Sequence, residues 1–195
     1  MFSELKDKIR SSILPFVKWI PLSPNLLTII GLLISFWAAV VFATGDLMAG
    51  ALLILFSGFF DMIDGAVARA KGRMTVFGAV LDSVCDRYAD AIVFAGIIYG
   101  SFTGTIVQNS LFSVPIWFWV VFAIMGSYMV SYVRSRAESA GVGSMNIGIA
   151  ERPERMIILV AGSLSGYLLE SIVLIVILTH ITMIQRLLYA KKELS

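Results

Sequence analysis

The sequence predicts an all-α integral membrane protein with six transmembrane helices, an N-terminal interfacial amphipathic helix, and both termini in the cytoplasm. The first observation is composition, because 58% of the 195 residues are hydrophobic and only 14% are charged. A soluble domain of this length cannot bury so much apolar surface. The other two observations are six long apolar segments and a one-sided placement of the cations. Together they predict a single membrane domain over residues 1–195.

The first 20 residues mix charged and apolar side chains, unlike the segments that follow. Phe2, Leu5, Ile9 and Ile13 recur at helical spacing, with lysines and an arginine between them. This pattern predicts a juxtamembrane amphipathic helix over residues 1–20, in the membrane interface. A solvated N-terminus held by anionic lipids is the alternative. No cleavable signal peptide is expected, because the segment is too charged and lacks a small-residue cleavage site.

Residues 26–190 contain six segments that are long enough to form a transmembrane bundle. A spanning helix needs about 20 residues, and turn residues punctuate the connections, as in ATGD, AKGR and AGVGSMNIG. The predicted spans are Leu26–Thr44, Leu47–Arg69, Val76–Gly100, Val114–Arg136, Arg152–Leu169 and Ser171–Tyr189.

The cations orient this bundle. All 15 lysines and arginines lie on one side of the six-helix arrangement or within a few turns of it. The opposite connections, near residues 45–47, 101–113 and 163–170, contain none. Because Lys- and Arg-rich ends stay in the cytoplasm, the sequence predicts a multi-pass plasma-membrane protein with its charged side in the cytoplasm.

Carboxylates lie inside the second and third predicted spans, where charge is costly. Asp61 and Asp64 are three residues apart and share one helix face, and Asp82 and Asp86 are four apart on the next helix. At 1.5 Å per residue, all four lie roughly 8–15 Å from the cytoplasmic helix ends. Four facing carboxylates would repel one another. They therefore predict one or two divalent cations, and oxygen-only ligands favour Mg²⁺, Mn²⁺ or Ca²⁺.

Small residues accompany these acids. Gly65 and Ala68 follow Asp64, Gly78 lies one turn before Asp82, and Arg69 lies one turn beyond Gly65. Space beside the carboxylates, with a cation at its mouth, suits a phosphate-bearing substrate. Close helix packing is the alternative for the small residues taken alone.

Residues 61–86 resemble the signature of the CDP-alcohol phosphotransferases, D-x2-D-G-x2-A-R-x8-G-x3-D-x3-D, at every fixed position. The resemblance implies an enzyme that moves a phosphatidyl or archaetidyl group from a CDP-lipid to an alcohol hydroxyl and releases CMP. It implies Mg²⁺ or Mn²⁺ as the cofactor, with Asp61, Asp64, Asp82 and Asp86 at the metal and Asp86 as the general base. It also implies a homodimer.

The resemblance further implies a nucleotide site. The stretch SPNLLT is similar to a second family element that holds the nucleotide end. Helix capping is the alternative role for its polar side chains. The residues implied for CDP binding are Asn25, Thr28, Asp61, Gly65, Ala68, Arg69 and Gly78.

Four arginines form a candidate pocket for an acceptor that carries phosphate: Arg134, Arg136, Arg152 and Arg155. Arginine is the natural partner of a phosphate group, although anchoring of helix ends and attraction of anionic lipid is the alternative. The stretches YVRSRAE, ERPERM and DSVCDRYAD, the last ending at Asp90, resemble the branch of the family that uses inositol phosphate. Glycerol-3-phosphate is the second candidate acceptor.

A different class, the ion-coupled transporters, also carries intramembrane carboxylates. That class predicts charge near the midplane and a path to both faces, whereas the outer connections here offer only Asp46 and Glu170. The partners implied by the family resemblance are a CDP-lipid donor, a phosphorylated polyol acceptor and membrane lipids. No nucleic acid is expected.

Overall fold

The computed structural model describes residues 21–107 and 110–195, so the amphipathic helix predicted over residues 1–20 lies outside the described residues. The regular elements of the described residues are helices, apart from one short antiparallel pair of strands, which confirms the predicted all-α class. Its elements are α2 (Pro24–Ala43), α3 (Leu47–Ala70), α4 (Val76–Thr103), β1 (Ser110–Leu111), β2 (Val114–Pro115), α5 (Ile116–Ser139), α6 (Arg152–Ser165) and α7 (Leu168–Leu194).

Polar caps and glycines set the helix ends. The side chains of Ser23, Asp46 and Thr75 accept hydrogen bonds from backbone N–H groups at the starts of α2, α3 and α4. These caps satisfy donors that have no partner within the helix. Gly104 and Gly166 end α4 and α6 in the left-handed conformation. Because Gly166 turns the chain, α6 stops short of the predicted Leu169 and α7 begins at Leu168.

Four of the helices, α2, α3, α5 and α7, are long and apolar enough to cross a membrane. The remaining two differ, because α4 carries several charged residues and α6 has only 14 residues, about 21 Å of helix. Large apolar side chains on the outer surface, such as Leu33, Trp37, Leu52 and Ile177, are half-exposed. These features identify a membrane protein.

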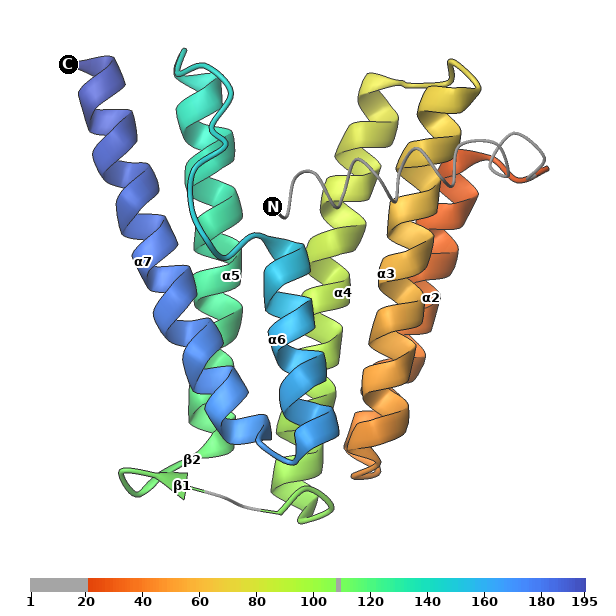
Figure 1. The fold of residues 1–195 in the computed structure, drawn as a ribbon, viewed down its shortest axis with the longest axis vertical. Helices are drawn as coiled ribbons and strands as arrows, with labels where there is room; N and C mark the ends of the chain where they lie inside the picture. Colours follow the sequence, from red (N-terminus) through yellow and green to blue (C-terminus); the bar gives the residue numbers. More distant parts are fainter. Residues whose placement is uncertain (1–20, 108–109) are drawn as a thin grey trace.

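The helices form two groups that separate toward one end of the molecule. α2 packs against α3 and α4, and α5 packs against α7, while α6 contacts both α3 and α7 (Figure 1). The apolar core includes Phe42, Phe94, Val120 and Ile172. At Gly96 an added Cβ would lie 2.2 Å from a backbone oxygen of α2, so α4 can approach α2 this closely only with glycine there.

The connection over residues 140–151 places the start of α6 deep in the bundle. It runs from the upper end of α5 down to mid-height before α6 begins (Figure 1). The N–H of Met145 donates to Glu138, the N–H of Ile149 donates to Thr182, and Arg186 donates to the carbonyl of Ile147. These bonds fix the descending chain, and the first residues of α6 therefore face the interior.

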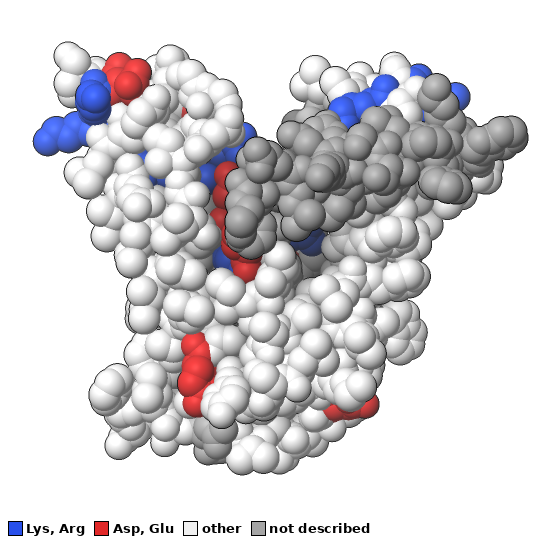
Figure 2. Space-filling view, in the orientation of Figure 1, with Lys and Arg blue, Asp and Glu red and all other residues white. Residues whose placement is uncertain are grey.

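The space-filling surface is hollowed between the two helix groups. Charged residues lie within this hollow, whereas the lower part of the same face is mainly uncharged, with isolated acidic groups (Figure 2). The fold thus brings the costly charges together at one end of the bundle, where the helices spread apart.

Candidate active site

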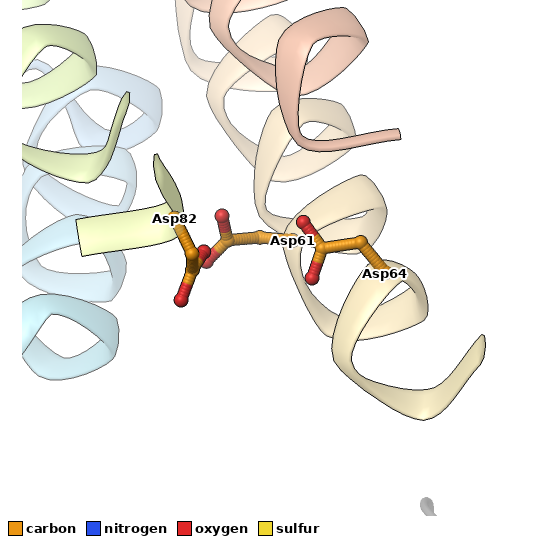
Figure 3. Close-up of side chains that lie close together, drawn as sticks. All are labelled: Asp61, Asp64 and Asp82. Atoms are coloured by element: carbon orange, nitrogen blue, oxygen red, sulfur yellow. The ribbon is translucent and has the colours of Figure 1, made fainter. Parts of the chain in front are cut away.

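Three aspartates converge from two helices. α3 supplies Asp61 and Asp64 and α4 supplies Asp82, and one carboxylate oxygen of each lies within 4.8 Å of the others (Figure 3). Both helices pack along α2, so α2 sets their separation. Thr28 of α2 donates a hydrogen bond of 2.5 Å to Asp64, which is buried. The cluster is therefore held from three helices.

The chemistry of this triad suits a divalent cation. Three carboxylates in a partly buried site repel one another unless a counter-charge lies between them. Carboxylate oxygen is the ligand that Mg²⁺ and Mn²⁺ prefer. Their convergence within 4.8 Å places the oxygens close enough to share one ion. The triad can therefore hold a divalent metal.

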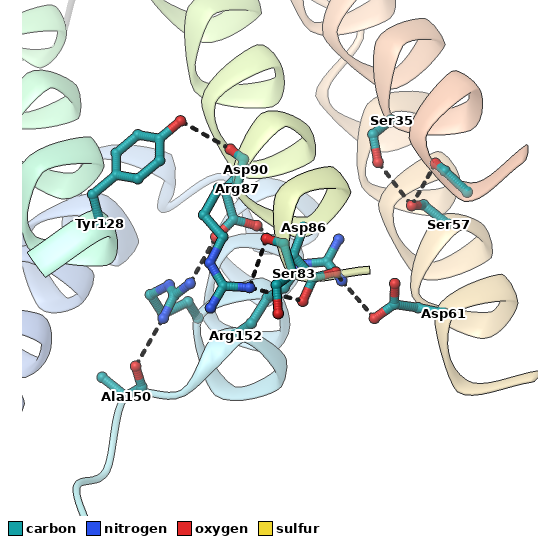
Figure 4. Close-up of polar contacts among 12 residues, drawn as sticks. Ser35, Ser57, Asp61, Ser83, Asp86, Arg87, Asp90, Tyr128, Ala150 and Arg152 are labelled. Carbon is teal, nitrogen blue, oxygen red and sulfur yellow. Dashed lines mark hydrogen bonds and ion pairs between the residues drawn. The ribbon is translucent and has the colours of Figure 1, made fainter. Parts of the chain in front are cut away.

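Asp86 and Asp90 lie further along α4 and are paired with arginines of α6. The Nη1 atom of Arg152 donates to Asp86 at 2.6 Å and to Asp61 at 2.5 Å, and its Nε donates to Asp90 at 3.1 Å. Arg155 donates to the second oxygen of Asp90 at 2.6 Å. Figure 4 shows this network between α3, α4 and α6. Of the four acids predicted at the metal, the structure gathers three, while Asp86 is joined to them through Arg152.

A cavity of about 440 Å³ lies between α2, α3 and α4 beside the triad. It contains six of the seven residues expected at the nucleotide, all except Asp61. The six are Asn25, Thr28, Gly65, Ala68, Arg69 and Gly78.

The two glycines of this cavity lie beside polar side-chain atoms. At Gly65, the nearest atoms that a Cβ would meet belong to the guanidinium of Arg69, at 3.2 Å. At Gly78, they are the side-chain oxygens of Thr75 and Asn25, at 2.9 and 3.3 Å. Both glycines therefore leave room for polar groups along the cavity wall.

A second, smaller cavity of about 170 Å³ lies between α4, α5, α6 and α7. Three of the four arginines expected at the acceptor line it, namely Arg134, Arg152 and Arg155, together with Asp86 and Asp90. Arg136 is exposed near the end of α5 and is not among the lining residues. Arg134 also pairs with Glu138 at 3.1 Å.

Sequence reasoning missed Arg186, a further arginine of this cavity. Arg186 is only 2% exposed, and it donates to the carbonyls of Val130 and Ile147 and to Glu151. The available signal was a single arginine within the apolar run of α7, since an ionisable residue inside a membrane helix usually has a functional partner.

A third cavity, of about 300 Å³, connects the acids to the apolar interior. Its wall combines Asp61, Asp86 and Arg152 with apolar side chains of α3, α4 and α6, among them Ile54 and Met156. Arg152 and Asp86 therefore line both this cavity and the arginine-lined one.

Comparison with known families agrees with this geometry. The sequence model for CDP-alcohol phosphatidyltransferases matches residues 21–189. The chain belongs to the CDP-alcohol phosphatidyltransferase family. The family resemblance read from residues 61–86 is thus confirmed, and the match also includes the arginine-bearing segments of α5, α6 and α7.

Two named relatives show which members of the CDP-alcohol phosphatidyltransferase family the chain is similar to. The archaetidylinositol phosphate synthase of Methanothermobacter thermautotrophicus is 40% identical over 201 residues, which covers 100% of this chain and 96% of that protein. The phosphatidylinositol phosphate synthase of Mycobacteroides abscessus is 41% identical over 143 residues, covering 73% of this chain and 62% of that protein.

Solved structures of a phosphatidylinositol phosphate synthase from Mycobacterium tuberculosis share the fold. The crystal structure with CDP-DAG bound matches with a TM-score of 0.77 and 33% identity, over 94% of each chain. A crystal structure of the same synthase in complex with manganese and citrate matches with a TM-score of 0.75 and 32% identity, over 95% of this chain and 88% of the other.

Proposed function

We propose that this family member transfers a phosphatidyl or archaetidyl group from a CDP-lipid to a hydroxyl of inositol phosphate and releases CMP. One observation carries the proposal: a cavity lined by the family motif and a cavity lined by arginines lie on the two sides of one group of aspartates. The first cavity is lined by Asp64 and Asp82 and the second by Asp86 and Asp90, so a donor and a phosphorylated acceptor can approach neighbouring carboxylates of one cluster. The names of both relatives include inositol phosphate, so glycerol-3-phosphate is not the favoured acceptor.

The metal centre is assigned to Asp61, Asp64, Asp82 and Asp86, with Mg²⁺ or Mn²⁺ as the ion. Bound there, the ion would supply Lewis-acid polarisation and neutralise the charge of the diphosphate. Thr28 holds Asp64 in position through its short hydrogen bond. The manganese complex of the Mycobacterium tuberculosis synthase supports a divalent ion in this fold.

The donor is assigned to the two cavities that border α3. Asn25, Thr28, Gly65, Ala68, Arg69 and Gly78 would contact the cytidine and diphosphate in the 440 Å³ cavity. The 300 Å³ cavity suits the lipid end, because its wall combines Asp61 with apolar side chains of α3, α4 and α6. CDP-DAG in the Mycobacterium tuberculosis synthase supports this class of donor.

The acceptor is assigned to the arginine-lined cavity. Arg134, Arg155 and Arg186, with Arg152 beside them, would bind its phosphate, since guanidinium groups match phosphate in charge and geometry. Asp86 lies on the same wall and would accept the proton of the attacking hydroxyl as the new phosphorus–oxygen bond forms. Arg136 lies outside this wall and is expected to contribute least.

The same assignment orients the protein in the membrane. We place the charged end of the bundle in the cytoplasm of the cell, with all six helices as spans, the short α6 and the charged α4 included. The concentration of lysines and arginines at that end supports this orientation. A homodimer in the plasma membrane is part of the proposal.

A product assay tests the function. Purified protein in detergent receives Mg²⁺, a CDP-lipid and one acceptor at a time, chosen from inositol phosphate, inositol and glycerol-3-phosphate. The expected result is CMP release and a new lipid only with inositol phosphate, and CDP-diacylglycerol and CDP-archaeol compared side by side identify the donor. Equal turnover with plain inositol would overturn the phosphate pocket. Turnover with glycerol-3-phosphate alone would overturn the choice of acceptor.

A further inference from the structure

Arg152 is the side chain that joins the two halves of the acidic cluster. It is the first residue of α6, and its guanidinium contacts carboxylates from both α3 and α4. One atom, Nη1, lies within hydrogen-bond distance of Asp61 and of Asp86 at once. This position, between two proposed metal ligands, is where a positive charge satisfies both acids.

The contact uses two carboxylates that belong to the proposed metal centre. Asp61 belongs to the triad of converging oxygens, and Asp86 is the fourth acid of the family motif. A carboxylate oxygen that accepts a strong hydrogen bond from a guanidinium must give up that bond, or share it, to coordinate a cation. A cation bound between the same two oxygens would take the place of Nη1.

Asp90 and Arg155 hold Arg152 in this position. Its Nε donates to one oxygen of Asp90, and the other oxygen of Asp90 accepts from Arg155. Asp90 and Arg155 are 5% and 3% exposed, so this support is buried. Arg155 is itself fixed by a 2.9 Å bond to the carbonyl of Ala150. Arg152 is therefore preorganised toward the acids rather than a mobile surface group.

We infer that Arg152 is an internal counter-ion that stands in for a divalent cation between Asp61 and Asp86, and that cation binding must displace it. This inference rests on the metal centre of the proposed function. Two consequences follow. Arg152 weakens metal binding in the donor-free protein, and it stabilises the metal-free protein by neutralising acids that would otherwise repel one another.

Arg87 provides a matched control. It also carries a positive charge beside Asp86, at 3.6 Å, but its side chain is 34% exposed and it donates to the backbone of Ser83. Arg87→Gln therefore removes one charge near the same acid without removing the bridge. Arg152→Gln removes a positive charge and also the bridge between Asp61 and Asp86. Comparison of the two variants separates the bridge from the general effect of charge.

The experiment is a Mn²⁺ titration followed by electron paramagnetic resonance, with full-length protein in detergent and without CDP-lipid. Arg152→Gln should bind Mn²⁺ about ten- to a hundredfold more tightly than wild type, the equivalent of one charge-assisted hydrogen bond. Arg87→Gln should change the dissociation constant by no more than about fivefold, because the Arg87–Asp86 pair is long, at 3.6 Å, and partly exposed. Asp82→Asn, which removes a triad ligand, should bind Mn²⁺ more weakly than wild type.

Thermal unfolding gives a second readout in case a variant is poorly stable. In EDTA, Arg152→Gln should unfold at a lower temperature than wild type, and Mn²⁺ should raise its Tm by more than it raises that of wild type. Arg152→Lys keeps the charge but lacks the planar guanidinium, so its Tm in EDTA and its response to Mn²⁺ should lie between those of wild type and Arg152→Gln. An equal Mn²⁺ affinity in wild type and Arg152→Gln, with Asp82→Asn weakened, would overturn the counter-ion alone. No Mn²⁺ binding by wild type would overturn the metal centre and the counter-ion together.

Discussion

The two sides of the site are built in different ways. The motif side consists of α3 and α4 placed on α2, and its acids and glycines lie within 26 consecutive residues. The arginine side draws Arg134, Arg155 and Arg186 from three helices and depends on the connection over residues 140–151. The motif side is therefore local in sequence and the arginine side is not. Substitutions on the two sides should separate donor and metal effects from acceptor effects.

The largest effect is expected at the metal. Asp82→Asn removes one of the three converging carboxylates, and a metal that polarises the reacting phosphate is worth several kcal/mol, or about three decades of rate. EDTA should abolish CMP release from wild type, and Mg²⁺ or Mn²⁺ should restore it. Asp46→Asn, at the cap of α3 away from the site, is the control and should keep its activity. Full wild-type turnover in EDTA would contradict the assignment.

Asp86 lies where the two sides meet, so its replacement tests which side it serves. If it accepts the proton of the acceptor hydroxyl, Asp86→Asn should lower kcat by about two to four decades while CDP-lipid still binds. Equilibrium binding of labelled CDP-lipid in the presence of Mg²⁺ measures whether the variant still binds the donor. A loss of donor binding together with turnover would make Asp86 chiefly a metal ligand.

The arginine side should show a smaller effect that is confined to the acceptor. Arg134→Ala removes one guanidinium from the 170 Å³ cavity, and loss of a charge-assisted hydrogen bond costs about 1.5–3 kcal/mol. The KM for inositol phosphate should rise about ten- to a hundredfold, with the KM for CDP-lipid unchanged. Arg136→Ala, two residues along the same helix but outside the cavity, is the matched control. Equal effects of both variants on both substrates would favour a role in anchoring the helix end.

The contrast between the two sides also explains what the sequence could predict. Helical spacing and the family motif predicted the convergence of Asp61, Asp64 and Asp82 and six residues that line the 440 Å³ cavity. Spacing along one helix fixes which side chains share a face, and the motif joins two helices that are adjacent in sequence. The partners of α6 could not be predicted in this way. The pairing of Arg152 with Asp61 depends on how far the chain descends before α6 begins, and that depth is set by contacts between residues distant in sequence.

The predicted end of α6 was wrong for a related physical reason. The predicted span Arg152–Leu169 assumed a helix of membrane length, whereas α6 has 14 residues and turns at Gly166. A short helix suffices there because the preceding connection has already entered the bundle (Figure 1). Arg152 and the buried Arg155 thus reach the acids of α4 within the bundle.

The smallest effect is expected at Thr28, which supports the metal only indirectly. Its hydroxyl donates to Asp64 and so orients an acid that would contact the ion. Loss of such a supporting hydrogen bond should lower the affinity for the metal by about tenfold. Thr28→Val keeps the shape and removes the donor, while Thr28→Ser keeps the donor and is the control. The Mg²⁺ concentration for half-maximal activity should rise in Thr28→Val, and the KM for inositol phosphate should stay constant because the arginine-lined cavity does not include α2. A raised acceptor KM in Thr28→Val would mean that the two sides are coupled and that the division between them is wrong.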